Sequence, residues 1–272
     1  MHFFVCTNCG FWQKHFAVPV RCPVCEDVRH TPPDDGYCFW TAEQAASKTQ
    51  TCWREVLPGV FQFWCEPRIG IGPCGYIICH KQGNIAFEAT GFYDQIALDF
   101  IAELGGLRWV AASHPHAYGA IWQLQQRFAP QIAIHVEDLV WTNTFAVTWP
   151  YDETLALAED ATLLHIGGHF AGHAVLYHAP SHTLFVGDAL KGHFEGDTLI
   201  GISCHKAFNR QIPLARSEIG RYREVFAPLD FSQVVTTFEL VPVGRAEVLR
   251  LYDQRLAGRP TCEPIGLFVV KK

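Results

Sequence analysis

The stretch with the strongest bearing on architecture and chemistry runs from Arg108 to Gly119 and reads RWVAASHPHAYG. Its first half, through Ser113, is short and apolar, which predicts a buried β-strand. His114 and His116 follow at once. On extended backbone two side chains at this spacing point to the same side, so both imidazoles can bind one metal ion. A His-x-His pair is weak evidence by itself, because such pairs also occur at surfaces and in cores.

Two later stretches strengthen the prediction of a metal site. GGHFAGH, residues 167–173, follows a predicted strand and contributes His169, and LFVGD, residues 184–188, ends another strand with Asp188. The carboxyl ends of strands are where α/β sheets usually place ligands. A third histidine and a carboxylate at strand ends would therefore complete the ligand set. Tyr118 is expected to reach the same cleft with its hydroxyl, where it could donate a proton or orient water.

Apolar strands alternate with helices from about residue 56 onward. Strands are predicted at 60–65, 76–80, 84–88, 108–113, 131–135, 162–166, 174–178, 183–186 and 233–237, and helices at 41–49, 94–104, 120–128, 215–226 and 244–257. Strand pairs followed by strand–helix units predict a mixed α/β layered fold.

In the order of these motifs, residues 52–272 resemble the metallo-β-lactamase superfamily. The sequence is similar in particular to a bacterial subgroup with a Ser-His-Pro-His-x-Tyr signature, a Gly-Gly-His-Phe turn and a later stretch, here Asn209 to Leu214. The resemblance implies an αββα four-layer sandwich with one or two metals in a shallow cleft. It also implies a three-histidine site and a carboxylate between the two metal positions, here His114, His116, His169 and Asp188.

The chain departs from that family at the second metal. Tyr118 and Gly119 stand where the family has Asp and His, and Phe238 and Glu239 stand where a late His is expected. Glu239 is the one substitute nearby. A site for a single metal ion is therefore expected.

A second metal site is predicted at the N-terminus. Cys6-x-x-Cys9 and Cys22-x-x-Cys25 are separated by twelve residues, and two such turns facing each other make a tetrahedral thiolate site. The segment resembles the rubredoxin-like module of rubrerythrins and also generic zinc ribbons. Four thiolates suit zinc with a structural role or iron with an electron-transfer role. Zinc is expected and iron stays open.

Length and composition set the broad class. The chain has 272 residues, 49% of them hydrophobic. A Pro/Gly-rich linker at 31–36 predicts a metal knuckle with linker at 1–36 and a metallo-β-lactamase-like domain at 37–272. The net charge of −6 argues against nucleic acid as a partner. No secretory signal or long apolar run is recognised, so no membrane span is expected, and eleven scattered cysteines make a poor disulfide framework. A cytoplasmic location is expected.

Three functions are compatible with these features. The first is a metallohydrolase that uses zinc or iron at the His/Asp site on a small ester, thioester, lactone or amide, with Asp188 and Tyr118 as catalytic residues. The second is a non-catalytic protein with a relict site, whose knuckle binds a protein partner. The third is an iron oxidoreductase that receives electrons from a rubredoxin-like knuckle.

Overall fold

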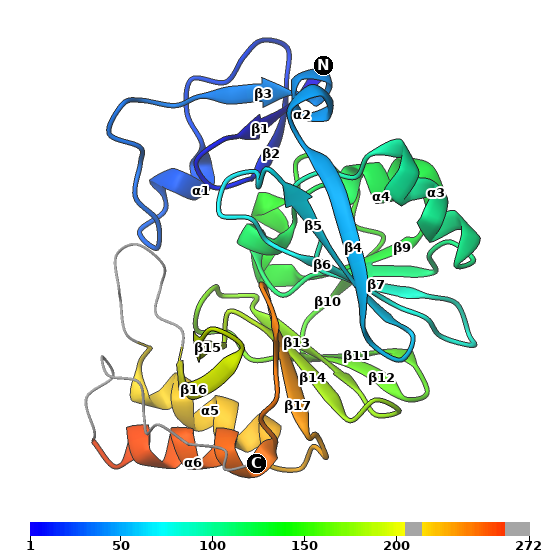
Figure 1. Cartoon of the computed structure of the whole chain (residues 1–272). Helices are drawn as coiled ribbons and strands as arrows, with labels where there is room; N and C mark the ends of the chain where they lie inside the picture. Colours follow the sequence, from blue (N-terminus) through cyan, green and yellow to red (C-terminus); the bar gives the residue numbers. More distant parts are fainter. Residues whose placement is uncertain (205–213, 259–272) are drawn as a thin grey trace.

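The computed structural model describes residues 1–204 and 214–258, and its larger part is built around two facing β-sheets (Figure 1). The first sheet has seven strands. In spatial order they are β10 (Trp149–Tyr151), β9 (Gln131–His135), β8 (Trp109–Ala111), β7 (Ile85–Phe87), β6 (Gly75–Ile78), β5 (Val60–Glu66) and β4 (Gln50–Leu57). Strands β7 to β10 pair in parallel, and β4 to β7 pair antiparallel.

The second sheet has six strands. In spatial order they are β11 (Thr154–Ala158), β12 (Ala161–His165), β13 (Ala174–His178), β14 (Thr183–Gly187), β17 (Gln233–Thr236) and β18 (Leu240–Val241). Its one parallel pair is β14 with β17, and the other neighbours are antiparallel. A separate hairpin is formed by β15 (Leu190–Glu195) and β16 (Thr198–Cys204).

Helices cover the outer face of each sheet (Figure 1). They are α3 (Gln95–Glu103) and α4 (Ile121–Phe128) on the first sheet, and α5 (Arg216–Phe226) and α6 (Arg245–Leu256) on the second. Three buried clusters separate the layers. Leu98 and Val110 belong to the first, Phe87 and Phe185 meet between the sheets, and Tyr222 and Val234 belong to the third. The predicted αββα four-layer sandwich is confirmed.

Local sequence explains where several elements begin. The Asp94 side chain accepts a hydrogen bond from Ala97 N at 2.9 Å and so caps α3, and the helix ends before Gly105. Successive residues of β7 and β8 are all buried, because both faces of these strands are covered. Within the described ranges, none of the helices has the length and apolar character that crossing a membrane requires.

The N-terminal segment forms a small sheet of its own. Its strands are β2 (Trp12–His15), β1 (His2–Cys6) and β3 (Phe39–Thr41), accompanied by α1 (Pro23–Glu26) and α2 (Ala42–Lys48). Strand β3 lies past residue 36, so this sheet extends beyond the predicted linker, and the division of the chain there stays a prediction. The small sheet packs on the sandwich: Trp12 Nε1 donates to Gly91 O at 2.8 Å, and Phe3 stacks on Trp122.

A buried histidine far from the metal ligands makes stability sensitive to acid. His178 ends β13, its Nδ1 lies 2.7 Å from Ser181 Oγ, and burial lowers its pKa from 6.5. Between the folded-state pKa of His178 and 6.5, the unfolded chain binds more protons than the folded protein. The stability that neutral His178 contributes is therefore fully present above pH 6.5, and it is lost as the pH falls from 6.5 toward the folded-state pKa. We expect the urea midpoint to decrease on acidification, and His178→Gln to reduce that decrease. The exposed His15 gives the control His15→Gln, and equal slopes in all three proteins would contradict the expectation.

Candidate metal centres

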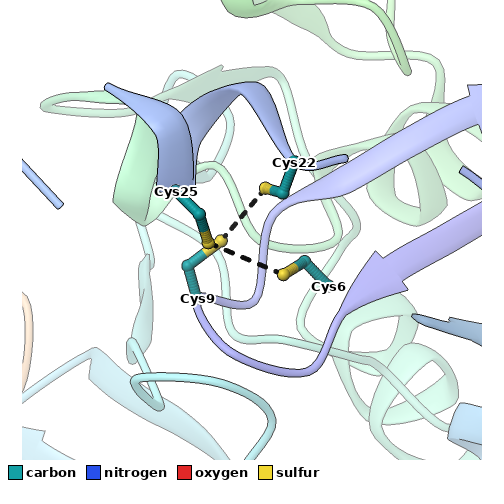
Figure 2. Close-up of side chains that lie close together, drawn as sticks. All are labelled: Cys6, Cys9, Cys22 and Cys25. Atoms are coloured by element: carbon teal, nitrogen blue, oxygen red, sulfur yellow. Dashed lines mark hydrogen bonds between the residues drawn. The ribbon is translucent and has the colours of Figure 1, made fainter. Parts of the chain in front are cut away.

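The four N-terminal cysteines converge on one point. Figure 2 shows their side chains directed toward one another, two from the end of β1 and the turn after it, and two from the N-cap and the body of α1. The sulfurs all lie within 4.8 Å of one another, with Cys6 Sγ 3.7 Å from Cys25 Sγ and Cys9 Sγ 3.6 Å from Cys22 Sγ. Metal–sulfur bonds of about 2.3 Å in a tetrahedron give sulfur–sulfur distances of about 3.8 Å. The cluster therefore fits a single ion with four thiolate ligands.

Short backbone turns hold the thiols in place. Gly10 N donates to Cys6 O at 2.8 Å, and Glu26 N donates to Cys22 O at 3.0 Å, which closes each Cys-x-x-Cys turn. Hydrogen bonds from neighbouring thiols, that of Cys22 first, hold the pKa of Cys6 far below its usual range, whereas burial raises that of Cys9. Full ionisation of all four thiols therefore requires a bound cation.

The second group joins residues from both sheets. His114 and His116 follow β8, the latter in a short 3-10 helix η1 (Pro115–Ala117), whereas His169 and Asp188 follow β12 and β14. Their ligand atoms lie within 4.8 Å of one another, and all four residues are at most 3% exposed. Asp188 Oδ2 is 3.4 Å from His114 Nε2 and 3.6 Å from His169 Nε2. Ligands about 2.1 Å from a tetrahedral ion lie about 3.4 Å apart, so the donor set fits one zinc or iron ion.

A buried hydrogen-bond chain orients His114. Glu88 Oε1 accepts hydrogen bonds from Ser113 Oγ and from Thr237 Oγ1, and Ser113 Oγ lies 2.8 Å from His114 Nδ1. Because the Ser113 proton goes to Glu88, the His114 Nδ1–H donates to Ser113, which leaves the Nε2 lone pair for a metal. Burial raises the pKa of Glu88 to about 8. The sequence offered one signal for this residue, an acid at the end of the strand predicted at 84–88.

Two further side chains support the His169 loop. Asp138 of η2 (Val136–Trp141) is buried, and its Oδ1 accepts a hydrogen bond from Gly172 N at 3.1 Å. Burial raises the pKa of Asp138 to about 6. His173 Nε2 donates to Val186 O at 3.2 Å and its ring lies 5.1 Å from that of His114. No sequence motif indicated Asp138, because its partner is 34 residues away.

Tyr118 lies in the core and outside the four converging ligands. It is 2% exposed, and its ring packs edge-on against Phe145 in the cluster between the first sheet and its helices. The tight turn η1 intervenes between His114 and Tyr118 and carries the chain toward α4. Burial raises the pKa of Tyr118 well above its usual range. The expected catalytic role of Tyr118 therefore gains no support from its position.

Gly119 and Glu239 stand where the metallo-β-lactamase superfamily has ligands of a second metal, and the structure surrounds them differently. Gly119 has φ +39°, and a Cβ there would lie 2.2 Å from Ala89 O, so this backbone leaves no room for a side chain. Glu239 is half-buried, and its Oε1 faces Gly192 of β15. It is not part of the four-residue group, which is the one His/Asp group found among the described residues. The motif at 209–214 lies outside the described residues except for Leu214.

Gly187 lies directly against Ser113, next to Asp188 in the chain. It has φ +54°, and an added Cβ would lie 2.3 Å from Ser113 Oγ. We expect Gly187→Ala to lower the free energy of unfolding by about 2 kcal/mol or more, since strained left-handed backbone alone costs on the order of 1–3 kcal/mol. The control is Gly220→Ala in α5, where an added Cβ meets nothing within 4 Å and should add about 0.5–1 kcal/mol. Urea unfolding measures both, and equal stabilities would contradict the expectation.

Comparison of the sequence with known proteins finds a relative over nearly the whole chain. No family model matches the chain. The uncharacterized protein YmaE of Bacillus subtilis (strain 168) is 28% identical over 256 residues, which cover 91% of this chain and 92% of YmaE.

Similar solved structures share the layered architecture at low sequence identity. VMB-1 is 15% identical with a TM-score of 0.57, over 76% of this chain and 97% of its own. The DIM-1 metallo-β-lactamase is 10% identical with a TM-score of 0.56, over 76% and 98%. FIM-1 from Pseudomonas aeruginosa, a metallo-β-lactamase in its mono-zinc form, is 11% identical with a TM-score of 0.55, over 78% and 99%. This chain therefore has the metallo-β-lactamase fold, with a four-cysteine cluster at its N-terminus and a His/Asp group at the strand ends of both sheets.

Proposed function

We propose that this chain is a metal-dependent hydrolase with one catalytic ion at the His/Asp centre. The convergence of four buried donors from both sheets is the observation that carries the proposal. The mono-zinc form of FIM-1 supports a single ion in this fold. The substrate class proposed is a small ester, thioester, lactone or amide.

The residues of the centre have separate roles in this proposal. When bound, a divalent ion supplies Lewis-acid polarisation of the carbonyl and brings the pKa of water to about 7. The three imidazoles would hold the ion and leave its fourth position to water, and the Glu88–Ser113 chain would fix the tautomer of His114. In this role Asp188 would stay outside the ligand set, and its Oδ2, beside His114 and His169, would orient the attacking water and accept its proton. Burial of these groups keeps bulk water away and strengthens their electrostatic effect.

The test is a hydrolysis panel run alongside elemental analysis. Protein purified without added metal should carry one ion per cluster and hydrolyse at least one ester, thioester, lactone or amide. Dialysis against a chelator should abolish that activity, and added Zn²⁺ or Fe²⁺ should restore it. Protein with metal in both clusters that hydrolyses nothing in the panel would contradict the proposal. Activity that survives metal removal would also contradict it.

A second candidate is an iron oxidoreductase, favoured by one contact. The ring of His30, from the knuckle, lies 5.5 Å from the ring of His116, so a knuckle side chain contacts one residue of the His/Asp centre. Iron at the four cysteines would support this alternative, and zinc there would count against it, because zinc has no redox chemistry. Elemental analysis and the visible spectrum of the purified protein distinguish the two.

A further inference from the structure

The segment that follows Cys25 contacts the His/Asp centre. His30 is 1% exposed, and its ring meets that of His116 edge-on, with centroids 5.5 Å apart. The guanidinium carbon of Arg29 lies 4.3 Å from the centroid of the Phe170 ring. Two consecutive residues of the knuckle therefore contact the two chain segments that carry His116 and His169.

Phe170 connects Arg29 with all three imidazoles of the centre. Its ring centroid lies 5.5 Å from that of His114, 5.1 Å from that of His116 and 5.3 Å from that of His169. All three imidazoles pack on this one phenyl ring. A cation over an aromatic face is attracted by the ring quadrupole, so Arg29 holds Phe170 as well as covering it.

The same segment is fixed to the cysteine cluster. Asn8 Nδ2 donates to Cys25 Sγ and to Thr31 O, each at 3.3 Å. His30 N donates to Asp27 O at 3.0 Å, and Arg29 pairs with the Asp27 carboxylate at 2.6 Å. Asp27 in turn ends α1, the helix that contains Cys25. The placement of Arg29 and His30 thus depends on how the chain is folded around the four thiols.

We infer that the cysteine knuckle is a positioning element for the His/Asp centre. With a metal ion at the cysteines, the Arg29–His30 segment orients His116 directly and the other imidazoles through Phe170. Groups that orient metal ligands commonly change metal affinity by about 10–100-fold when mutated. The inference rests on metal binding at the proposed centre, although not on the hydrolytic reaction.

The experiment is a Co²⁺ titration of the full-length chain. Thiolate-bound cobalt has intense charge-transfer bands that a His/Asp site lacks, so the two sites are followed separately. We expect His30→Ala and Arg29→Ala to weaken Co²⁺ binding at the His/Asp centre by about tenfold or more, with the cysteine site unchanged. His30→Phe keeps a ring against His116 and should restore affinity. The exposed His15, on the same knuckle, gives the control His15→Ala.

The outcomes separate this inference from the hydrolase proposal. Unchanged affinity at the His/Asp centre in both His30→Ala and Arg29→Ala would overturn the inference. Wild-type protein that binds no Co²⁺ at that centre would overturn both proposals. Wild-type protein with normal cobalt binding, a weakened His30→Ala variant and no hydrolysis would support the inference and reject the hydrolase.

Discussion

His114→Ala is expected to remove the ion from the His/Asp centre and to reduce hydrolysis about a thousandfold, because a catalytic metal supplies several kcal/mol of transition-state stabilisation and each 1.36 kcal/mol is a factor of ten. His114 is fully buried, with Nδ1 held by Ser113 and Nε2 beside Asp188. Alanine would leave a void and deprive Asp188 of this neighbour. Elemental analysis should find one ion fewer per chain.

The control for this variant is another histidine of the same sheet. His80 follows β6, which runs antiparallel to β7, so it lies at the edge opposite to the His/Asp centre. It pairs with Asp160 at 2.7 Å. His80→Ala should therefore retain both ions and the activity. A His114→Ala protein that keeps its full metal content would show that the ion binds elsewhere.

Elements with strong local signals could be predicted from the sequence. The strand at 131–135 is observed as β9 (Gln131–His135), and the helix at 215–226 as α5 (Arg216–Phe226), because apolar spacing and turn residues mark them. The hairpin β15–β16 (Leu190–Cys204) had no such signal, since its central residues are mostly polar. Strand β4 (Gln50–Leu57) was not predicted, since the first expected strand was 60–65, and it forms along β5 as its antiparallel partner.

The sequence predicted those ligands of the candidate sites that lie together in short motifs. Cys-x-x-Cys and His-x-His each place two ligands together without knowledge of the rest of the fold. Contacts such as Arg29 with Phe170 or Glu88 with Ser113 depend on which elements become neighbours in space, and one sequence does not specify this. The surroundings of Tyr118 also depend on the fold. Its ring packs in the core, and its expected role at the cleft stays a prediction.

Cys22→Ser is expected to have the largest effect on stability. Cys22 is fully buried at the start of α1, and its sulfur faces that of Cys9. Structural zinc in zinc-finger peptides contributes about 10–16 kcal/mol to folding, so a knuckle without its ion should not keep its fold. Hydrogen exchange should then reach amides of β1 (His2–Cys6) within the shortest labelling times, and Trp12 should lose its contact with Trp122.

The two-sheet part of the molecule is the internal comparison for this variant. The cluster between the two sheets and the cluster under α5 and α6 contain no knuckle residue, so exchange in β13 (Ala174–His178) should stay slow. Cys79→Ser, a half-exposed thiol outside the cluster, should match wild type throughout. Because α1 also anchors Arg29 and His30, Cys22→Ser should bind metal at the intact His/Asp centre about tenfold or more weakly. Rapid exchange in β1 with unaltered affinity at that centre would mean that the two metal groups are neighbours in space and independent in function.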